Sequence, residues 1–229
     1  MYTWKAPSWH RNRIETFQVV EPGMYDFGVA DTIVFVLAGG KSSRMGRHKA
    51  FLEIEGRTLL SRTIELARAL SDQVRIVGDS EKFSTFGPVV EDIYPERGPL
   101  GGIHAALSSS AAELNLMLAV DLPLLRAGLL QFLITQSRQA GAVVTVPRVG
   151  GGFQPLCALY RKAFLKPAEA ALIEGKNKID ALFSQVATRV IEESELERAG
   201  FSAQMFSNVN TPEEYERAVR DLRAQAGLR

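Results

Sequence analysis

The chain has 229 residues, of which 46% are hydrophobic, and its formal net charge is +1. This composition is typical of a globular protein and excludes a disordered chain, while the near-zero charge leaves no basic surplus for general nucleic-acid binding. No apolar run reaches the ~18 residues that a membrane-spanning helix requires, so no membrane partner is expected.

Residues 1–30 differ in character from the rest of the chain. They contain both tryptophans and several basic residues without periodicity, and they lack the roughly 7–15-residue apolar core of a secretory signal. We therefore expect an N-terminal extension at 1–30, followed by a single domain at 31–229. Met24 offers an alternative start, because the regular pattern begins a few residues after it.

The first core element is expected at 33–36, where four apolar residues follow one another. Such a run fits a strand that is buried on both faces, as in a parallel sheet. The chain then becomes glycine-rich and basic up to Lys49. Because ligands of open α/β sheets bind beyond the carboxyl ends of the strands, this loop lies where a ligand is expected.

The loop has the chemistry of a phosphate-binding segment. Gly39 and Gly40 lack a Cβ, so the backbone can approach a ligand closely and its N–H groups can form an anion-binding concavity. Arg44 could hold phosphate oxygens in a fork, and Lys49 would act as a point charge. Neither the dinucleotide fingerprint nor the Walker pattern fits this spacing. On these residues alone, a solvated basic turn stays open as the alternative.

Strands and helices alternate after the loop, which predicts an α/β fold with a mainly parallel sheet and helices on both faces. The helical pattern is clearest at the C-terminus, where Thr211 to Glu214 form a capping box with a proline at the first helical position. Further strands are predicted at 74–77, 88–90, 114–120, 142–146, 156–160 and 188–191. Further helices are predicted at 59–70, 99–109, 129–139, 161–174 and 179–183.

Two acidic residues follow strands of this pattern. Asp121 comes directly after the apolar strand 114–120, and a carboxylate there suits Mg²⁺, which prefers one or two carboxylates together with phosphate oxygens and waters. An Asx turn is the alternative. Asp92 follows the strand 88–90 and precedes Gly101 and Gly102 in the next helix. Close approach of a ligand to that helix N-terminus and tight packing of helix on sheet both explain the two glycines.

The order Leu-Ala-Gly-Gly-x-Ser-x-Arg-Met-Gly-x-x-Lys at 37–49 resembles the signature of nucleotidyltransferases, and most closely that of the molybdenum cofactor guanylyltransferases. Val-Asp-Leu-Pro at 120–123 resembles the metal-binding aspartate motif of that family. Asp92 with Gly-Pro-Leu-Gly-Gly at 98–102 resembles the segment whose aspartate contacts the nucleotide. The resemblance extends from about Ile33 to the C-terminal helix. It implies a three-layer α/β/α fold with a Rossmann-like sheet of the nucleotide-diphospho-sugar transferase type.

The resemblance also implies an activity: transfer of GMP from GTP to the molybdopterin form of the molybdenum cofactor, with release of pyrophosphate. Catalytic roles fall on Arg44, Lys49 and Asp121, with Mg²⁺ held by Asp121. Nucleotide contacts are implied for Leu37, Ala38, Gly39, Gly40, Lys49, Gly78, Asp92 and Asp121, although Gly78 stands where the family often has Asn and could offer only its backbone. Regions bordering the pterin substrate are implied at Gln154, Asn208 and Asn210, where turn formation is the alternative for both asparagines.

Other activities of related chemistry stay open. In this resemblance Gly39-Gly40 goes with guanine and an Ala-Gly pair with cytosine, so a cytidylyltransferase for the same cofactor is the nearest alternative. A sugar-phosphate nucleotidyltransferase of the same fold is another, and a non-catalytic nucleotide-binding module is an alternative of a different class. Loss of the loop cations or of the acidic residue would favour the module, and both are present.

The sequence also gives expectations for two single residues, His48 and Cys157. His48 stands where the family commonly has Asp, and we expect an exposed loop position there rather than a metal ligand. Cys157 is the one cysteine, so no internal disulfide can form, which fits a reducing compartment and a cytoplasmic protein. Without a nearby His base, Cys157 is not expected to act as a nucleophile. Molybdoenzymes or other proteins of the cofactor pathway are the protein partners that the resemblance suggests.

Overall fold

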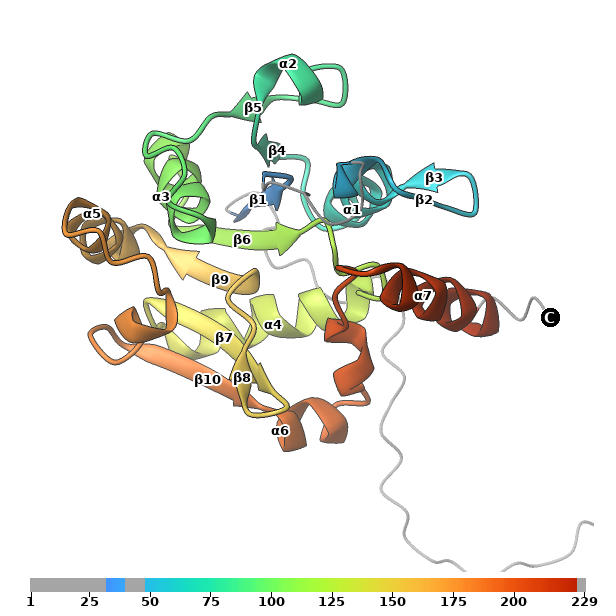
Figure 1. The fold of residues 1–229 in the computed structure, drawn as a ribbon. Helices are drawn as coiled ribbons and strands as arrows, with labels where there is room; N and C mark the ends of the chain where they lie inside the picture. The colour runs from blue at the N-terminus through green and yellow to red at the C-terminus, as the bar shows by residue number, and fades with distance from the viewer. Residues whose placement is uncertain (1–31, 40–47, 226–229) are drawn as a thin grey trace, which may run out of the picture.

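The computed structural model describes residues 32–39 and 48–225. At its centre lies an eight-stranded sheet in the order β10-β7-β9-β6-β1-β4-β5, with β8 paired to β7 (Figure 1). The strands are β1 (Thr32–Leu37), β4 (Val74–Val77), β5 (Val89–Val90), β6 (Leu114–Ala119), β7 (Val144–Val149), β8 (Gly152–Phe153), β9 (Cys157–Arg161) and β10 (Thr188–Glu192). A separate small hairpin joins β2 (Glu53–Ile54) to β3 (Arg57–Thr58).

The sheet is mainly parallel, as expected. β1 pairs in parallel with both β4 and β6, β4 with β5, and β10 with β7. The exceptions are β8, which runs antiparallel to β7, and β9, which runs antiparallel to both β6 and β7; the arrows of β6 and β9 point in opposite directions in Figure 1. The chain reverses through Gly150 and Gly151, whose φ angles of 58° and 77° are readily adopted only by glycine. Apolar patterning predicts that a strand exists but not its direction, so this reversal was not foreseen.

Seven α-helices lie within the described residues. They are α1 (Leu59–Arg68), α2 (Ser80–Phe83), α3 (Pro99–Ser109), α4 (Ala127–Ala140), α5 (Leu165–Ile173), α6 (Glu193–Arg198) and α7 (Pro212–Gln225). The helix predicted at 99–109 has the bounds of α3, and Thr58 caps α1 by accepting the N–H of Ser61 at 3.1 Å. The helix predicted at 161–174 is shorter, because Arg161 still belongs to β9 and Lys162–Phe164 form a 3₁₀ turn before α5. The helix predicted at 179–183 is only a 3₁₀ turn at Asp180–Leu182.

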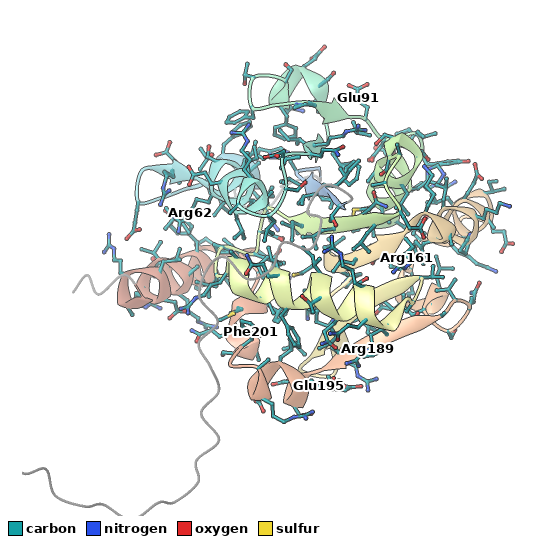
Figure 2. The ribbon with its side chains drawn as sticks, turned by 180° about the vertical axis from the view of Figure 1, so that it is seen from behind. Arg62, Glu91, Arg161, Arg189, Glu195 and Phe201 are labelled. Carbon is teal, nitrogen blue, oxygen red and sulfur yellow. The ribbon has the colours of Figure 1, made fainter. Side chains whose placement is uncertain are left out.

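Two hydrophobic clusters cover the two faces of the sheet and confirm the three-layer arrangement. Along β1 the side chains alternate: Val34 and Val36 belong to one cluster, whereas Phe35 belongs to the other. The first cluster includes buried residues of α1, α4 and α6, and the second includes those of α3 and α5. Figure 2, seen from behind, shows α4 in front of the strands that it covers. Because both faces are buried, the strands read as continuous apolar runs.

The C-terminal helix packs on the β2–β3 hairpin rather than on the sheet. Val209 and Ala218 form a small buried cluster with Ile54 and Leu59, and the hydroxyl of Tyr215 donates to the carbonyl oxygen of Glu53. α7 therefore lies beside α1 and the hairpin in Figure 1. This packing brings the chain before α7 next to the region that follows η2 (Lys49–Phe51). Among the described residues, no helix is both long and apolar enough to cross a membrane.

Candidate active site

Four parallel strands end in register, and the line along their carboxyl ends is called the edge of the sheet from here on. Val90 pairs with Val77, Val77 with Leu37, and Leu37 with Ala119, so these residues form one row across β5, β4, β1 and β6. At a strand spacing of about 4.8 Å the row spans roughly 14 Å, within the length of an extended nucleoside triphosphate. The residues that follow this row are therefore placed along one ligand-sized edge.

At the β6 end of this edge, Lys49 and Asp121 come together. Nζ of Lys49 lies 3.5 Å from Oδ2 of Asp121 and also donates a hydrogen bond to Oδ1 of Asn210. The two charged side chains are 24% and 22% exposed, so they are held by the protein but can still be reached by a ligand. Two residues to which the resemblance assigned catalytic roles, Lys49 and Asp121, therefore lie side by side.

The Asp121 carboxyl is influenced by two opposing effects. Burial raises its pKa above the ordinary value, because desolvation disfavours the charged form, while the neighbouring Lys49 ammonium lowers it. Its position is set by the backbone: the carbonyl oxygen of Asp121 accepts the N–H of Val209 at 2.9 Å. Both charges of this pair are thus available for contacts with ligand groups of opposite charge.

The start of the glycine loop lies between the ends of β4 and β6. The side chains of Leu37 and Ala38 are buried, so only their backbones could face a ligand. Ala38 donates its N–H to Val77, and the carbonyl oxygen of Leu37 accepts from Val120 at 3.3 Å. Gly39 is exposed at this edge. Two further loop predictions, Gly40 and Arg44, lie outside the described residues.

Gly78 follows β4 directly beside Gly39. A Cβ on Gly78 would lie 2.8 Å from the ring of Phe83 and 3.5 Å from the backbone nitrogen of Gly39.

The expectation for His48 was wrong in one respect. Instead of being exposed, it is half-buried, with its ring 5.4 Å from that of Phe83 and 5.7 Å from that of Phe51. Burial lowers the pKa of His48, and a nearby lysine lowers it further. The imidazole is therefore an aromatic packing contact rather than an exposed basic group.

Asp92 lies at the β5 end of the edge, near the start of α3. Its Oδ1 would be 3.7 Å from a Cβ on Gly102, and although the residue as a whole is exposed, partial desolvation of the carboxyl raises its pKa. The same added Cβ would lie 3.3 Å from Leu37, so tight packing of helix on sheet accounts for Gly102. The preceding residue, Glu91 (Figure 2), instead accepts the hydroxyl hydrogen of Ser80 in α2.

The residues expected near the acceptor substrate are divided between two segments. Gln154 is part of the turn before β9, where the carbonyl oxygen of the next-but-one residue, Leu156, accepts the N–H of Ala119 at 2.8 Å. This turn therefore lies at the same edge, next to the end of β6. Asn208 is exposed and lines a hollow beside α7, whereas Asn210 contacts Lys49.

Other chemistry at the described residues is limited. No group of three or more His, Cys, Asp or Glu side chains that could hold a metal ion occurs within 32–39 and 48–225. The Cys157 thiol is fully buried and burial raises its pKa to about 12, which agrees with the expectation that it is no nucleophile.

Sequence reasoning missed one pairing at this site. Asn210 was placed at the acceptor substrate, and its bond to Lys49 joins residues that are 161 positions apart. No periodicity or motif spacing can connect residues so distant. The one available signal was the capping box at 211–214, which indicated that the chain before α7 is held in place.

Comparison with known proteins gives a consistent result. The profile of the MobA-like NTP transferase domain matches residues 34–190. A probable molybdenum cofactor guanylyltransferase of Carboxydothermus hydrogenoformans is 34% identical over 188 residues, which cover 82% of this chain and 94% of the relative. The molybdenum cofactor guanylyltransferase of Desulfosudis oleivorans is 32% identical over 192 residues, covering 82% and 95%. The crystal structure of molybdopterin-guanine dinucleotide biosynthesis protein A from Archaeoglobus fulgidus matches with a TM-score of 0.75 at 25% identity, covering 83% of this chain and 98% of that one.

Proposed function

The chain belongs to the family of MobA-like NTP transferases, and from this premise we propose that it is a molybdenum cofactor guanylyltransferase. In the proposed reaction, the terminal phosphate of molybdopterin attacks the α-phosphorus of GTP. The bond from that phosphorus to the bridging oxygen breaks, pyrophosphate leaves, and a guanine dinucleotide form of the cofactor results. The observation that carries the proposal is the meeting of Lys49 and Asp121 beyond the end of β6.

Such a transfer requires positioning and charge neutralisation more than a protein nucleophile. A phosphate monoester is mostly dianionic at neutral pH, because its second pKa is near 6, so the acceptor needs no activating base. In this proposal Lys49 neutralises charge that builds on the departing pyrophosphate. Arg44 acts with it, and the backbone of the loop around Gly39 and Gly40 binds the phosphates.

We propose Mg²⁺ as the metal, with Asp121 as its protein ligand. The donor set fits, since a single carboxylate with phosphate oxygens and waters is a usual arrangement for this hard cation. A second observation supports Asp121 as a cation ligand: its partly desolvated carboxylate already has a cation, the Lys49 ammonium, beside it. When bound, the metal supplies charge neutralisation for phosphate oxygens. Asp121 would hold this metal at the edge of the sheet.

The remaining assignments follow the order of residues along that edge. Leu37, Ala38, Gly78 and Asp92 are proposed to line the nucleoside side, near β1, β4 and β5. The other side, at β6 and β9, is left for the acceptor, with Gln154 and Asn208 proposed to border it. We also propose that the protein works in the cytoplasm without nucleic acid or a membrane surface, and hands its product to molybdoenzymes or other proteins of the pathway. The unpaired, buried thiol of Cys157 supports the reducing compartment.

One competition experiment tests the activity. The protein is incubated with molybdopterin, Mg²⁺ and an equimolar mixture of GTP, CTP, ATP and UTP, and the products are identified by mass spectrometry. The proposal expects the guanine dinucleotide product and one pyrophosphate for each product formed. A cytosine dinucleotide as the main product would replace the proposal with its nearest alternative. Transfer to a hexose 1-phosphate but not to molybdopterin would indicate a sugar-phosphate enzyme.

A further inference from the structure

The segment before α7 contacts both charged residues of the candidate active site. Val209 donates its N–H to the carbonyl oxygen of Asp121 at 2.9 Å, and Oδ1 of Asn210 accepts a hydrogen bond from Nζ of Lys49. The side chain of Val209 is fully buried beside Ile54 and Leu59. Because one neighbour is anchored in a hydrophobic cluster, the backbone at Asn210 has little freedom to move away from Lys49.

Glu214 holds the backbone of Asn210 from the other side. One carboxylate oxygen, Oε2, accepts the N–H of Asn210 at 2.6 Å and the N–H of Thr211 at 3.1 Å. In return, the N–H of Glu214 donates to Oγ1 of Thr211 at 3.3 Å. This reciprocal capping box joins the first turn of α7 to the residue that touches Lys49. The amide of Asn210 is thus carried on a braced backbone.

We propose that Asn210 is a positioning residue that holds the Lys49 ammonium for the triphosphate, and that Glu214 acts through Asn210. This inference rests on the proposed function and deepens it by making the C-terminal helix part of the nucleotide site. An ammonium has three N–H donors. The neutral amide of Asn210 takes one of them without cancelling the charge, whereas Asp121 both orients the ammonium and neutralises it.

The energetic reason is the flexibility of lysine. Ordering a long Lys side chain is entropically unfavourable, and an ion pair with a single carboxylate leaves the ammonium free to move around it. A second acceptor on a different element restricts Lys49 to one position before the nucleotide arrives. Preorganisation of this kind increases affinity and rate without adding a contact to the ligand.

A double-mutant cycle tests whether Asn210 acts through Lys49. The variants are Asn210→Ala, Lys49→Ala and the double variant, and the readouts are GTP affinity by calorimetry and kcat/KM for pyrophosphate release. We expect Asn210→Ala to lower both by about tenfold, as for loss of a hydrogen bond to a charged group, and to cause no further loss in the Lys49→Ala background. Equal losses in both backgrounds would overturn the inference, since Asn210 would then act independently of Lys49.

Rescue at Glu214 separates positioning from stability. The Glu214→Gln variant keeps an oxygen that can accept the two N–H groups, so it should restore most of the GTP affinity that Glu214→Ala loses. The matched control is Glu195→Ala, which removes the capping-box carboxylate of α6 and its pairing with Arg189, on the face shown in Figure 2. This control should lower thermal stability and leave GTP affinity unchanged. If Glu195→Ala weakens GTP binding as much as Glu214→Ala does, the effect of Glu214 is general destabilisation and the inference falls.

A labelling experiment gives a result that does not require the proposed activity. The ligand-free protein is treated briefly with acetic anhydride, and acetylation of Lys49 relative to the exposed Lys178 is measured by mass spectrometry. Asn210→Ala should increase the relative labelling of Lys49. If it does while the wild-type protein transfers no GMP, the positioning stands and the proposed function fails. If wild-type transfer is observed and the labelling of Lys49 does not change, the proposed function stands and the positioning is wrong.

Discussion

Nζ of Lys49 lies 3.5 Å from Oδ2 of Asp121, although 72 positions separate the two residues in the chain. One residue follows the glycine loop after β1 and the other follows β6, and these two strands are parallel neighbours. Their carboxyl ends therefore meet, and the charged groups beyond them share one small region. A ligand with several negative charges is the chemistry that this arrangement suits.

Removing the charge of Lys49 should impair transfer much more than binding of the acceptor. We expect Lys49→Met to lower kcat/KM for GTP about 10²–10³-fold, the range seen when one preorganised electrostatic contact is removed. Steady-state pyrophosphate release measures the change. The matched control is Lys166→Met in α5, an exposed lysine on a helix away from the edge, which should have the wild-type rate. If the two variants behave alike, Lys49 has no part in the chemistry.

The raised pKa of Asp121 predicts how stability depends on pH. A carboxyl whose pKa is higher in the folded state binds more protons when folded, so its contribution to stability falls as pH rises from the ordinary value of 3.8 through the raised folded pKa. The variant Asp121→Asn lacks this term. We expect its melting temperature, relative to wild type, to be higher at pH 7 than at pH 3.5.

Thermal melts of both proteins across this pH range, without ligands, check the prediction. The matched control is Asp72→Asn, an exposed aspartate before β4 at the opposite edge of the sheet. A difference for Asp121→Asn that does not change with pH, or that favours wild type more strongly at pH 7, would contradict the burial of this carboxyl.

Gly78 should tolerate no side chain, for reasons of packing. A Cβ there would lie 2.8 Å from the ring of Phe83, which is fully buried and cannot swing away freely. We expect Gly78→Ala to destabilise the protein by about 1–3 kcal/mol, as overpacking does. In urea unfolding, Gly128→Ala serves as the comparison. Gly128 lies in α4, and a Cβ there would be 3.7 Å from the ring of Phe201, an ordinary van der Waals contact, so this variant should be stabilised by up to ~1 kcal/mol.

Cys157 should be chemically inert while the protein is folded. Its thiol is buried in β9 and its pKa is raised to about 12, so almost no thiolate is present near neutral pH. We expect iodoacetamide at pH 8 to leave the native protein unmodified and to alkylate the single cysteine after unfolding in urea. Rapid alkylation of the native protein, detected by mass spectrometry, would show that β9 opens readily or that this environment is wrong.

The sequence predicted those parts of the fold that depend on local patterning. Continuous apolar residues indicated β1 and β6, and a proline at the first helical position indicated α3 with its observed bounds. The two-residue strands β2, β3 and β8 and the short helices α2 and α6 were missed, because so few residues carry no periodicity. The direction of β9 was missed too, since burial on both faces looks alike in either direction.

For the site, the sequence placed residues at strand ends but could not pair them. Asp121 and the glycine loop were each expected at the carboxyl end of a strand, but the parallel pairing of these two strands, β1 and β6, is known only from the structure. The bond from Lys49 to Asn210 depends on how α7 docks on the β2–β3 hairpin, which no local pattern encodes. His48 was misjudged for the same reason, because its ring packs on Phe83 from α2, a helix that was not predicted.

Calorimetric binding of GTP with and without Mg²⁺, compared between wild type and Asp121→Asn, tests most directly whether Asp121 brings a metal to the same triphosphate that Lys49 contacts. We expect Mg²⁺ to strengthen GTP binding in the wild-type protein and in Lys49→Met, and this strengthening to be lost in Asp121→Asn. If Asp121→Asn keeps the full effect of Mg²⁺ on GTP affinity, Asp121 does not hold the metal, and Lys49 and Asp121 do not serve one metal–triphosphate site.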